Sequence, residues 1–125
     1  MSLLTVESYL SLVRVGILMR FGHLRSIHSL LRKQRLLETN GQQSATVERI
    51  CHAMDLACVF YPKRVLCLQR AAATTLVFRR HGWRAEMVIG TQLVPFRSHA
   101  WVELNGVAIN DKPYVREMYV PLERC

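Results

Sequence analysis

The hydrophobic pattern of the chain changes its period at Gly82. Before this residue, apolar side chains recur every three to four positions, which predicts amphipathic helices. After it they alternate with polar ones, as in "RAEMVIGTQ" at 84–92 and "FRSHAWVELN" at 96–105, which predicts half-buried strands. Asn105-Gly106 then indicates a tight hairpin turn. Helices followed by an antiparallel sheet predict an α+β fold, with N-terminal helices packed on a small antiparallel sheet.

The helical part is predicted to contain four helices. They cover residues 3–19, residues 23–37, a segment from a cap at Ser44 to a stop at Pro62, and a segment from Cys67 to a stop at Gly82. The first helix is more apolar than an ordinary surface helix, with Leu3, Tyr9, Leu10, Val13 and Ile17 near helical spacing. Its surplus apolar surface either covers the core or contacts a partner protein.

Three of the four cysteines lie in the last two predicted helices. One apolar stripe contains Val47, Ile50, Cys51, Met54 and Cys58, so both of its cysteines are predicted to be small core hydrophobes. Cys67 instead opens a helix with an alanine-rich interior that suits a deep position in the core. The last turn of that helix carries cations that suit the helix dipole, namely Arg79, Arg80 and His81.

Two further strands are predicted after the hairpin turn, a return strand at 107–111 and a short edge strand at 118–122. A two-residue turn pairs Leu104 with Val107. The strand at 96–105 has two different faces. One face suits the core and consists of Ser98, Ala100, Val102 and Leu104; the other consists of Arg97, His99, Trp101 and Glu103.

Length and cysteine usage limit the class of protein. With 125 residues the chain is predicted to be a single domain, with a helical part at 1–82 and a sheet part at 83–125. No CxxC pair is present, so a zinc site or a redox dithiol has little support, and reduced, cytoplasmic thiols are expected. The N-terminal segment resembles neither a signal peptide nor a membrane span.

The charge of the chain is strongly positive, with 17 Lys and Arg against 9 Asp and Glu. Six of the basic residues gather between Arg14 and Arg35, in a segment without any acid. A solvated helical face explains this pattern, and so does a docking surface for an acidic partner. No nucleic-acid-binding motif accompanies the charge, so nucleic acid is not an expected partner.

Three residues offer the parts of a cysteine-nucleophile active site. At a helix start, the thiolate of Cys67 is favoured by the helix dipole and by backbone N–H groups. His99 on a packed strand could accept the thiol proton. A carboxylate or amide on the next strand, such as Asp111, could orient the imidazole. Two ordinary explanations stay open, in which Cys67 is a packed thiol and His99 a structural histidine.

Two stretches of the chain, "CLQRAAATTLVFRRHGWRAEMVIG" and "PFRSHAWVELNGVAIND", resemble a known family. They are similar to the papain-like transglutaminase core of the leader peptidases of lasso-peptide biosynthesis, over about residues 64 to 113. The resemblance implies that Cys67 is the nucleophile, His99 the general base and acid, and Asp111 the orienting acid. The implied reaction hydrolyses one peptide bond through an acyl-enzyme, releases the leader from the core peptide, and needs no metal or organic cofactor.

The same resemblance implies protein partners. A small winged-helix leader-recognition protein delivers the precursor peptide, and an ATP-dependent cyclase then closes the ring. Because the chain starts directly with the helical part, leader recognition is expected to reside in a separate protein.

The expected hairpin register leaves the orienting residue undecided. Paired residues share a face of the sheet, so Asp111 would pair with Ala100 on the face away from His99. Asn110 would instead lie on the His99 face, opposite Trp101. A bulge that shifts the register, a bent strand end, or Asn110 as the orienting residue would each resolve the conflict. Trp101 and Asn110 are also candidates for contacts with substrate.

Two other functions use the same fold. In a transglutaminase-like acyltransferase the same triad would act, with an amine in place of water as the acceptor. A non-catalytic peptide-binding module would retain the fold and would not need Cys67.

Overall fold

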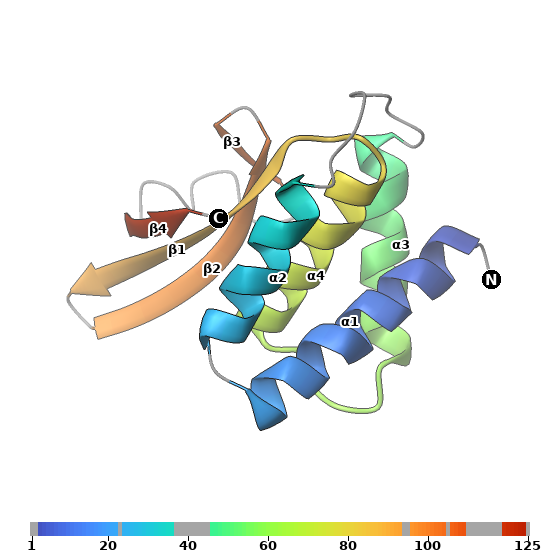
Figure 1. The fold of residues 1–125 in the computed structure, drawn as a ribbon, viewed down its shortest axis with the longest axis horizontal. Coiled ribbons are helices and arrows are strands. Elements are labelled where there is room, and N and C mark those ends of the chain that lie inside the picture. The colour runs from blue at the N-terminus through green and yellow to red at the C-terminus, as the bar shows by residue number, and fades with distance from the viewer. Residues whose placement is uncertain are drawn as a thin grey trace.

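The computed structural model describes residues 3–22, 24–36, 46–93, 96–104, 106–109 and 119–124. Within these ranges it has the helices α1 (Leu3–Phe21), α2 (Leu24–Leu36), α3 (Val47–Phe60) and α4 (Cys67–Arg80). The strands β1 (Ala85–Leu93), β2 (Phe96–Leu104), β3 (Val107–Ile109) and β4 (Val120–Arg124) form one antiparallel sheet in the order β3-β2-β1-β4. All helices lie on one side of this sheet (Figure 1). The predicted α+β fold is therefore confirmed.

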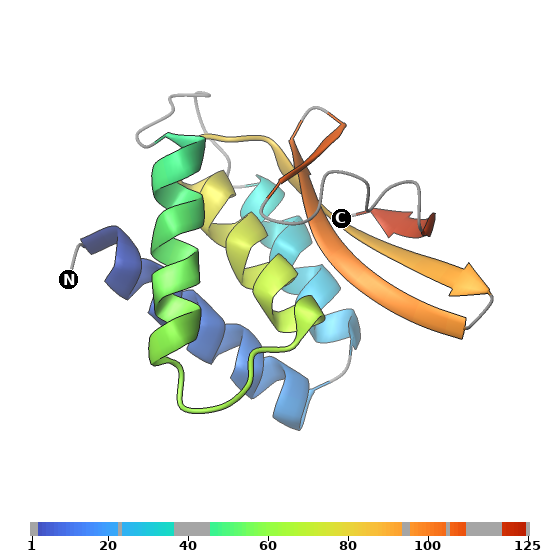
Figure 2. The same ribbon diagram turned by 180° about the vertical axis from the view of Figure 1, so that it is seen from behind.

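The central helix of the fold is α4. It contacts the other three helices as well as β1 and β2, and Figure 2 shows it running between α2 and α3. Every residue from 71 to 79 is buried. The three alanines at the start of this stretch let neighbouring backbones approach closely, so the predicted deep position of the alanine-rich helix is confirmed.

The ends of the helices follow local sequence signals. Gly82 has a φ of 84° and ends α4 as predicted, because glycine adopts this conformation without a steric penalty. The cap of α3 is Thr46 rather than the predicted Ser44, which lies outside the described residues. The Thr46 Oγ1 accepts a hydrogen bond from the backbone N–H of Arg49 at 3.2 Å, so the helix begins two residues later than a Ser44 cap would allow.

The inner face of α1 combines apolar side chains with small polar ones. Its buried residues are Leu4, Thr5, Ser8, Ser11, Leu12 and Val15. Their size allows close contact with α4, where Gln69 Nε2 donates a hydrogen bond to the carbonyl oxygen of Leu12 at 2.9 Å. A Cβ atom on Gly16 would lie 2.8 Å from the Tyr61 hydroxyl and 3.0 Å from Gln69 Nε2, so a larger residue there would displace these side-chain ends.

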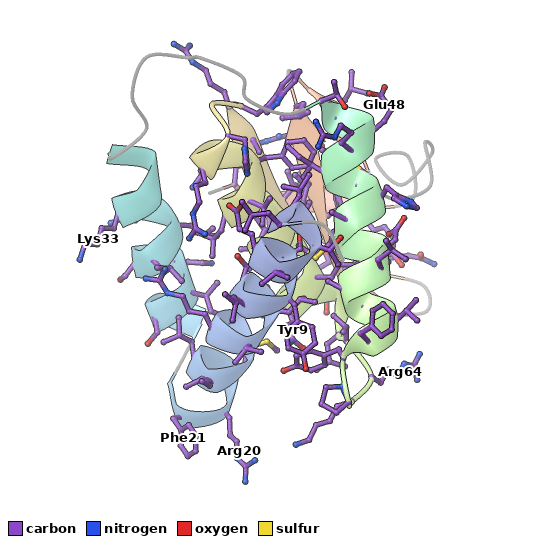
Figure 3. The ribbon with its side chains drawn as sticks, turned by 90° about the vertical axis from the view of Figure 1, so that its right-hand side faces the viewer. Tyr9, Arg20, Phe21, Lys33, Glu48 and Arg64 are labelled. Carbon is purple, nitrogen blue, oxygen red and sulfur yellow. The ribbon has the colours of Figure 1, made fainter. Side chains whose placement is uncertain are left out.

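Five other apolar side chains of α1 face solvent. Leu3, Val6, Leu10, Ile17 and Phe21 are between 40% and 84% exposed, and Figure 3 shows Phe21 pointing away from the helices. Coverage of the core is thus the wrong explanation for Leu3, Leu10 and Ile17, because the close crossing with α4 selects small residues on the inner face. Within the described ranges, each helix is too short or insufficiently apolar to cross a membrane.

Arg79 joins three elements of the fold. Its side chain is buried, with Nε donating to the carbonyl oxygen of Ala85 at 2.9 Å and a terminal nitrogen donating to that of Leu31 at 2.6 Å. The two following side chains bind α1, since Arg80 and His81 lie 3.3 Å and 2.9 Å from the two carboxylate oxygens of Glu7. The predicted cationic last turn therefore also holds α1, α2 and β1 against α4.

Candidate active site

Cys67 lies at the first position of α4, with an exposed side chain. The N-cap residue is Leu66, which makes no side-chain cap hydrogen bond. Backbone N–H groups of the first helical turn therefore remain available to a negative charge. The local sequence achieves this because the loop after α3, including Pro62, leads directly into the helix without a Ser, Thr, Asp or Asn cap.

Cys67 meets His99 beside an edge of β2. Described pairs between β2 and β3 end at Val102, whereas pairs between β2 and β1 continue past His99 to Phe96. The described residues of β3 thus leave this part of the edge uncovered. The side chains of Cys67 and His99 share a hydrogen bond, and the backbone N–H of Ala100 donates to the Cys67 sulfur.

These contacts favour the Cys67 thiolate. The hydrogen bond with His99 has the largest effect and lowers the pKa of Cys67 below its ordinary value of 9.0, although partial burial acts in the opposite direction. Backbone N–H groups of Ala100 and Leu68 lower this pKa further. A thiolate held next to an imidazole is the arrangement that nucleophilic catalysis requires.

Alkylation should distinguish Cys67 from the other cysteines that the structure describes. Burial raises the pKa of Cys51 to about 11 and also raises that of Cys58. Because iodoacetamide reacts with the thiolate, labelling of Cys67 should reach its half-maximal rate below pH 9.0, and labelling of Cys51 only near pH 11. His99→Ala should move the Cys67 midpoint upward. Peptide mapping by mass spectrometry after timed labelling measures each midpoint; a Cys67 midpoint as high as that of Cys58 would contradict the assignment.

Aromatic side chains hold the ring of His99. The Trp101 ring stacks on it with centroids 6.1 Å apart and planes at 24°, and the Tyr119 ring lies 5.4 Å away. Gly90 makes room for this arrangement, since a Cβ atom there would lie 2.7 Å from the Trp101 ring. The imidazole is therefore confined by packing from β1, β2 and the segment before β4.

A buried polar network supports the Trp101 ring from behind. Its Nε1 donates to Glu103 Oε2 at 2.8 Å, and Arg124 donates to Glu103 Oε1 at 2.8 Å. Only 2% of Glu103 is exposed. Sequence reasoning missed this role for Glu103, Arg124 and Tyr119. Gly90 inside a strand was an available signal, because glycine there often marks a close approach of another group.

A pocket of about 300 Å³ lies beside Cys67 and His99. One wall is a single face of α4, with Cys67, Arg70, Ala71 and Thr74 at helical spacing. The opposite wall comes from β2 and β3 and includes Val102 and Ile109. Trp101 lines the pocket too, although it is 2% exposed and mainly packs on His99. The pocket has the position and size to hold part of a peptide next to the Cys67 sulfur.

The candidate orienting residues, Asp111 and Asn110, lie outside the described residues. The described part of the hairpin has the predicted register, with Leu104 paired with Val107 and Val102 with Ile109. Gly106 has a φ of 80°, as a tight turn requires. No bulge interrupts these described pairs. Between Leu104 and Val102 the strand therefore lacks the register shift that would bring Asp111 to the His99 face.

The other cysteines differ from Cys67 in their surroundings. Cys51 and Cys58 are half-buried at the margin of the core rather than at its centre, which Ile50, Ala53, Met54 and Ala57 occupy. The prediction that both cysteines are core side chains is correct only in part. The fully buried face of α3 is centred on Ala53 and Ala57, and the two cysteines lie beside it. In the ranges that the structure describes, no three His, Cys, Asp or Glu side chains gather as metal ligands.

The chain matches a known protein family. Residues 11–124 match the family model of the transglutaminase-like superfamily. A curated relative, the microcin J25-processing protein McjB of Escherichia coli, is 39% identical over 51 residues, which are 41% of this chain and 24% of that relative. No solved structure matches the chain. Because the family match includes both the helix that Cys67 opens and the strand that carries His99, the chain belongs to the transglutaminase-like superfamily.

Proposed function

We propose that the chain is a cysteine peptidase that removes the leader from a lasso-peptide precursor. The observation that carries this proposal is the hydrogen-bonded pair of Cys67 and His99, with its lowered thiol pKa, at the side of a pocket. The name of the relative, a microcin J25-processing protein, supports a precursor peptide as substrate. The resemblance of the "HAWVELNGVAIND" block to lasso leader peptidases supports release of a leader.

The proposed reaction has two steps. The Cys67 thiolate attacks the carbonyl carbon of the scissile bond, and the C–N bond breaks as the imidazolium of His99 gives its proton to the leaving amine. Water then attacks the thioester, with His99 taking one proton, and the acyl fragment leaves as a carboxylic acid while the thiol is restored. The backbone N–H of Cys67 at the helix start is a suitable donor to the oxyanion.

Orientation of His99 is assigned to Asp111 in this proposal. The resemblance to the family supports Asp111, whereas the regular strand pairing supports Asn110, since an amide can also orient an imidazole in cysteine peptidases. Stacking by Trp101 and Tyr119 limits rotation of the ring, so the orienting residue has mainly to select the tautomer.

The mass of the products tests the proposed reaction against acyl transfer. The encoded precursor peptide is incubated with this protein and a leader-recognition partner, and the products are analysed by mass spectrometry. Hydrolysis yields two fragments whose masses sum to the precursor plus one water. A fragment joined to an added amine would identify an acyltransferase instead, and an intact precursor that is nevertheless bound would indicate a binding module.

The outer face of α1 is the proposed docking surface for the separate leader-recognition protein. Five exposed apolar residues follow one another at spacings of three, four or seven residues, as in a seam that meets another helix: Leu3, Val6, Leu10, Ile17 and Phe21. Arg14 and Arg20 are exposed on the same helix, and Glu7 is engaged by Arg80 and His81. The surface therefore suits an amphipathic helix with acidic flanks, and two copies of this basic chain would repel each other there.

Acidic substitutions in this seam should weaken the complex. Leu10→Glu and Ile17→Glu each place a charge at the centre of the apolar contact and should lower partner affinity at least about tenfold in isothermal titration calorimetry. Val59→Glu is the matched control, because Val59 is also apolar and exposed but lies on α3. If all three variants bind like wild type, the partner docks elsewhere.

Cys51, Cys58 and Cys67 are free thiols, which fits a reducing, cytoplasmic location. An ATP-dependent cyclase acting on the released core peptide follows from the resemblance to the lasso family.

A further inference from the structure

Glu103 carries a buried charge that neither step of the proposed reaction uses. Only 2% of the residue is exposed. One oxygen of its side chain accepts a hydrogen bond from Trp101 Nε1 and the other accepts one from Arg124, each at 2.8 Å. Because both oxygens accept from N–H groups, the side chain is held as a carboxylate rather than as a neutral acid. A buried carboxylate acts on its neighbours more strongly than an exposed one, because solvent screens it less.

The negative charge of Glu103 is only partly balanced. Glu86 is the partner of Glu103 in the pairing of β1 with β2, so the two carboxylates share a face of the sheet. The guanidinium of Arg124 lies 2.8 Å from a carboxylate oxygen of Glu103 and 3.7 Å from one of Glu86. Two carboxylates and one guanidinium leave a formal charge of −1 in this group. Since 42% of the Glu86 side chain is exposed, solvent screens that carboxylate, and the charge of Glu103 acts inside the protein.

Trp101 connects this charge with His99. A carboxylate that accepts the indole N–H polarises the ring and raises the electron density of its face. That ring stacks on the imidazole of His99, with centroids 6.1 Å apart and planes at 24°. Gly90, which pairs with His99 across the strands, leaves room for the ring, because a Cβ atom there would lie 2.7 Å from it. An electron-rich ring against an imidazole favours its cationic form, the imidazolium, through a cation–π interaction.

Other charged groups act on the same imidazole. Among the side chains that the structure describes, those that line the pocket or contact the ring of His99 and can carry a charge are Arg64, Cys67, Arg70 and Tyr119. Arg64 is exposed and Arg70 forms an ion pair with Asp55, so both cations act weakly on His99. The Cys67 thiolate is another negative group at the ring, and its hydrogen bond with His99 lowers the pKa of Cys67. Glu103 therefore acts in the same direction as the thiolate and against the two arginines.

We propose that Glu103 stabilises the imidazolium form of His99 through the indole ring of Trp101. Glu103 is then a positioning residue that touches neither the substrate nor the reacting atoms. When the proton of the Cys67 thiol moves to the imidazole, Glu103 favours the resulting pair of thiolate and imidazolium over the neutral pair. The inference rests on the proposed peptidase function, in which this pair starts the reaction, and adds a second carboxylate to the candidate orienting residue Asp111.

The pH dependence of Cys67 alkylation tests this role without any cleavage assay. Timed labelling with iodoacetamide and peptide mapping give the pH midpoint at which the thiolate forms. Glu103→Gln keeps the shape of the side chain and removes its charge, so this midpoint should rise by about half a pH unit, towards that of His99→Ala. Glu86→Gln is the matched control, because Glu86 shares the face and Arg124, whereas the indole N–H is donated to Glu103. Its midpoint should stay within about 0.2 pH units of wild type.

A double variant tests the path through the indole ring. Trp101→Phe keeps an aromatic ring beside His99 but has no N–H group, so its midpoint should rise at least as far as that of Glu103→Gln. Because the two changes interrupt one path, their combination should raise the midpoint no further than Trp101→Phe alone.

Fluorination of the indole ring tests the same path with the side chains of the network intact. In a Trp83→Phe background, 4-fluorotryptophan replaces only Trp101 and keeps its shape and its hydrogen bond. Fluorine withdraws electron density from the ring, so the midpoint of Cys67 alkylation should rise relative to the same background with ordinary tryptophan. This measurement decides the role of Glu103 even if Glu103→Gln does not fold.

The outcomes separate the two proposals. An unchanged midpoint in Glu103→Gln or in the fluorinated protein would overturn the inference about Glu103. A rise of equal size in Glu86→Gln, or a Glu103→Gln effect that persists in full beside Trp101→Phe, would overturn it as well, because either would indicate a general field rather than action through the indole ring. A precursor that wild type does not cleave would refute the peptidase function, while the alkylation midpoints would still decide the role of Glu103.

Discussion

Cys67→Ala is expected to abolish leader release, with cleavage slowed by about 10³-fold or more, because the proposed acyl-enzyme forms on the Cys67 sulfur. The fold should persist, since the Cys67 side chain is exposed and belongs to no apolar cluster. Mass spectrometry of the precursor after timed incubation, with melting temperatures recorded in parallel, gives the rate and the stability of each variant. Cys51→Ala is the matched control and should cleave like wild type, because its thiol is half-buried with a pKa raised to about 11.

The same assay distinguishes the two candidates for the orienting residue. If Asp111 orients His99, Asp111→Ala should slow cleavage by about 10² to 10⁴-fold, and Asn110→Ala should have a much smaller effect. The reverse order would assign the role to Asn110, as the regular hairpin register suggests. Cleavage by Cys67→Ala at the wild-type rate would remove the basis of both assignments and favour a binding module.

Arg79→Met is expected to cause a large loss of stability although Arg79 lies outside the site. It removes two buried hydrogen bonds from a charged donor, to the carbonyl oxygens of Leu31 and Ala85. At about 1.5 to 3 kcal/mol for each such bond, the free energy of unfolding should fall by roughly 3 kcal/mol or more. Urea denaturation followed by circular dichroism measures this change through the midpoint at constant m-value.

Arg80→Met serves as the control for that measurement. It changes the adjacent residue in the same way, but its partner Glu7 is reached at 3.3 Å by a side chain that is 43% exposed. Surface ion pairs of this kind contribute about 0 to 1 kcal/mol, so the midpoint should move little. Equal effects of the two substitutions would show that Arg79 acts only through its charge at the helix end.

Local signals predicted the elements of secondary structure well. Gly82 and Pro62 ended helices, and Gly106 turned the hairpin, because each acts through backbone geometry within a few residues. The Thr46 cap was missed in favour of Ser44, since both can accept the same kind of hydrogen bond and the choice depends on where packing starts the helix.

Patterns of apolar residues were less reliable for burial. On α1 five apolar residues that are suited to burial are exposed, whereas Ser8 and Ser11 are buried beside Leu12, because the close crossing with α4 favours small side chains at these positions. On β2 both faces are buried at Trp101 and Glu103, since Tyr119 and Arg124 cover the face away from the helices. Tyr119 and Arg124 are far from β2 in the sequence, so no local pattern could indicate that they bury this face of the strand.

For the candidate site, the sequence by itself determined which side chains were available and that Cys67 would open a helix, because helix starts are set by the residues around them. Strand alternation placed His99 on the face opposite to the core-facing residues Ala100 and Val102, and the prediction that it would meet Cys67 came from their chemistry and from the family resemblance rather than from any local pattern. Only the tertiary structure brought them together, because α4 docks so that its first residue lies beside the edge of β2, where His99 can reach it. That position results from the packing of α4 against three helices and two strands, which is a property of the whole fold rather than of any segment.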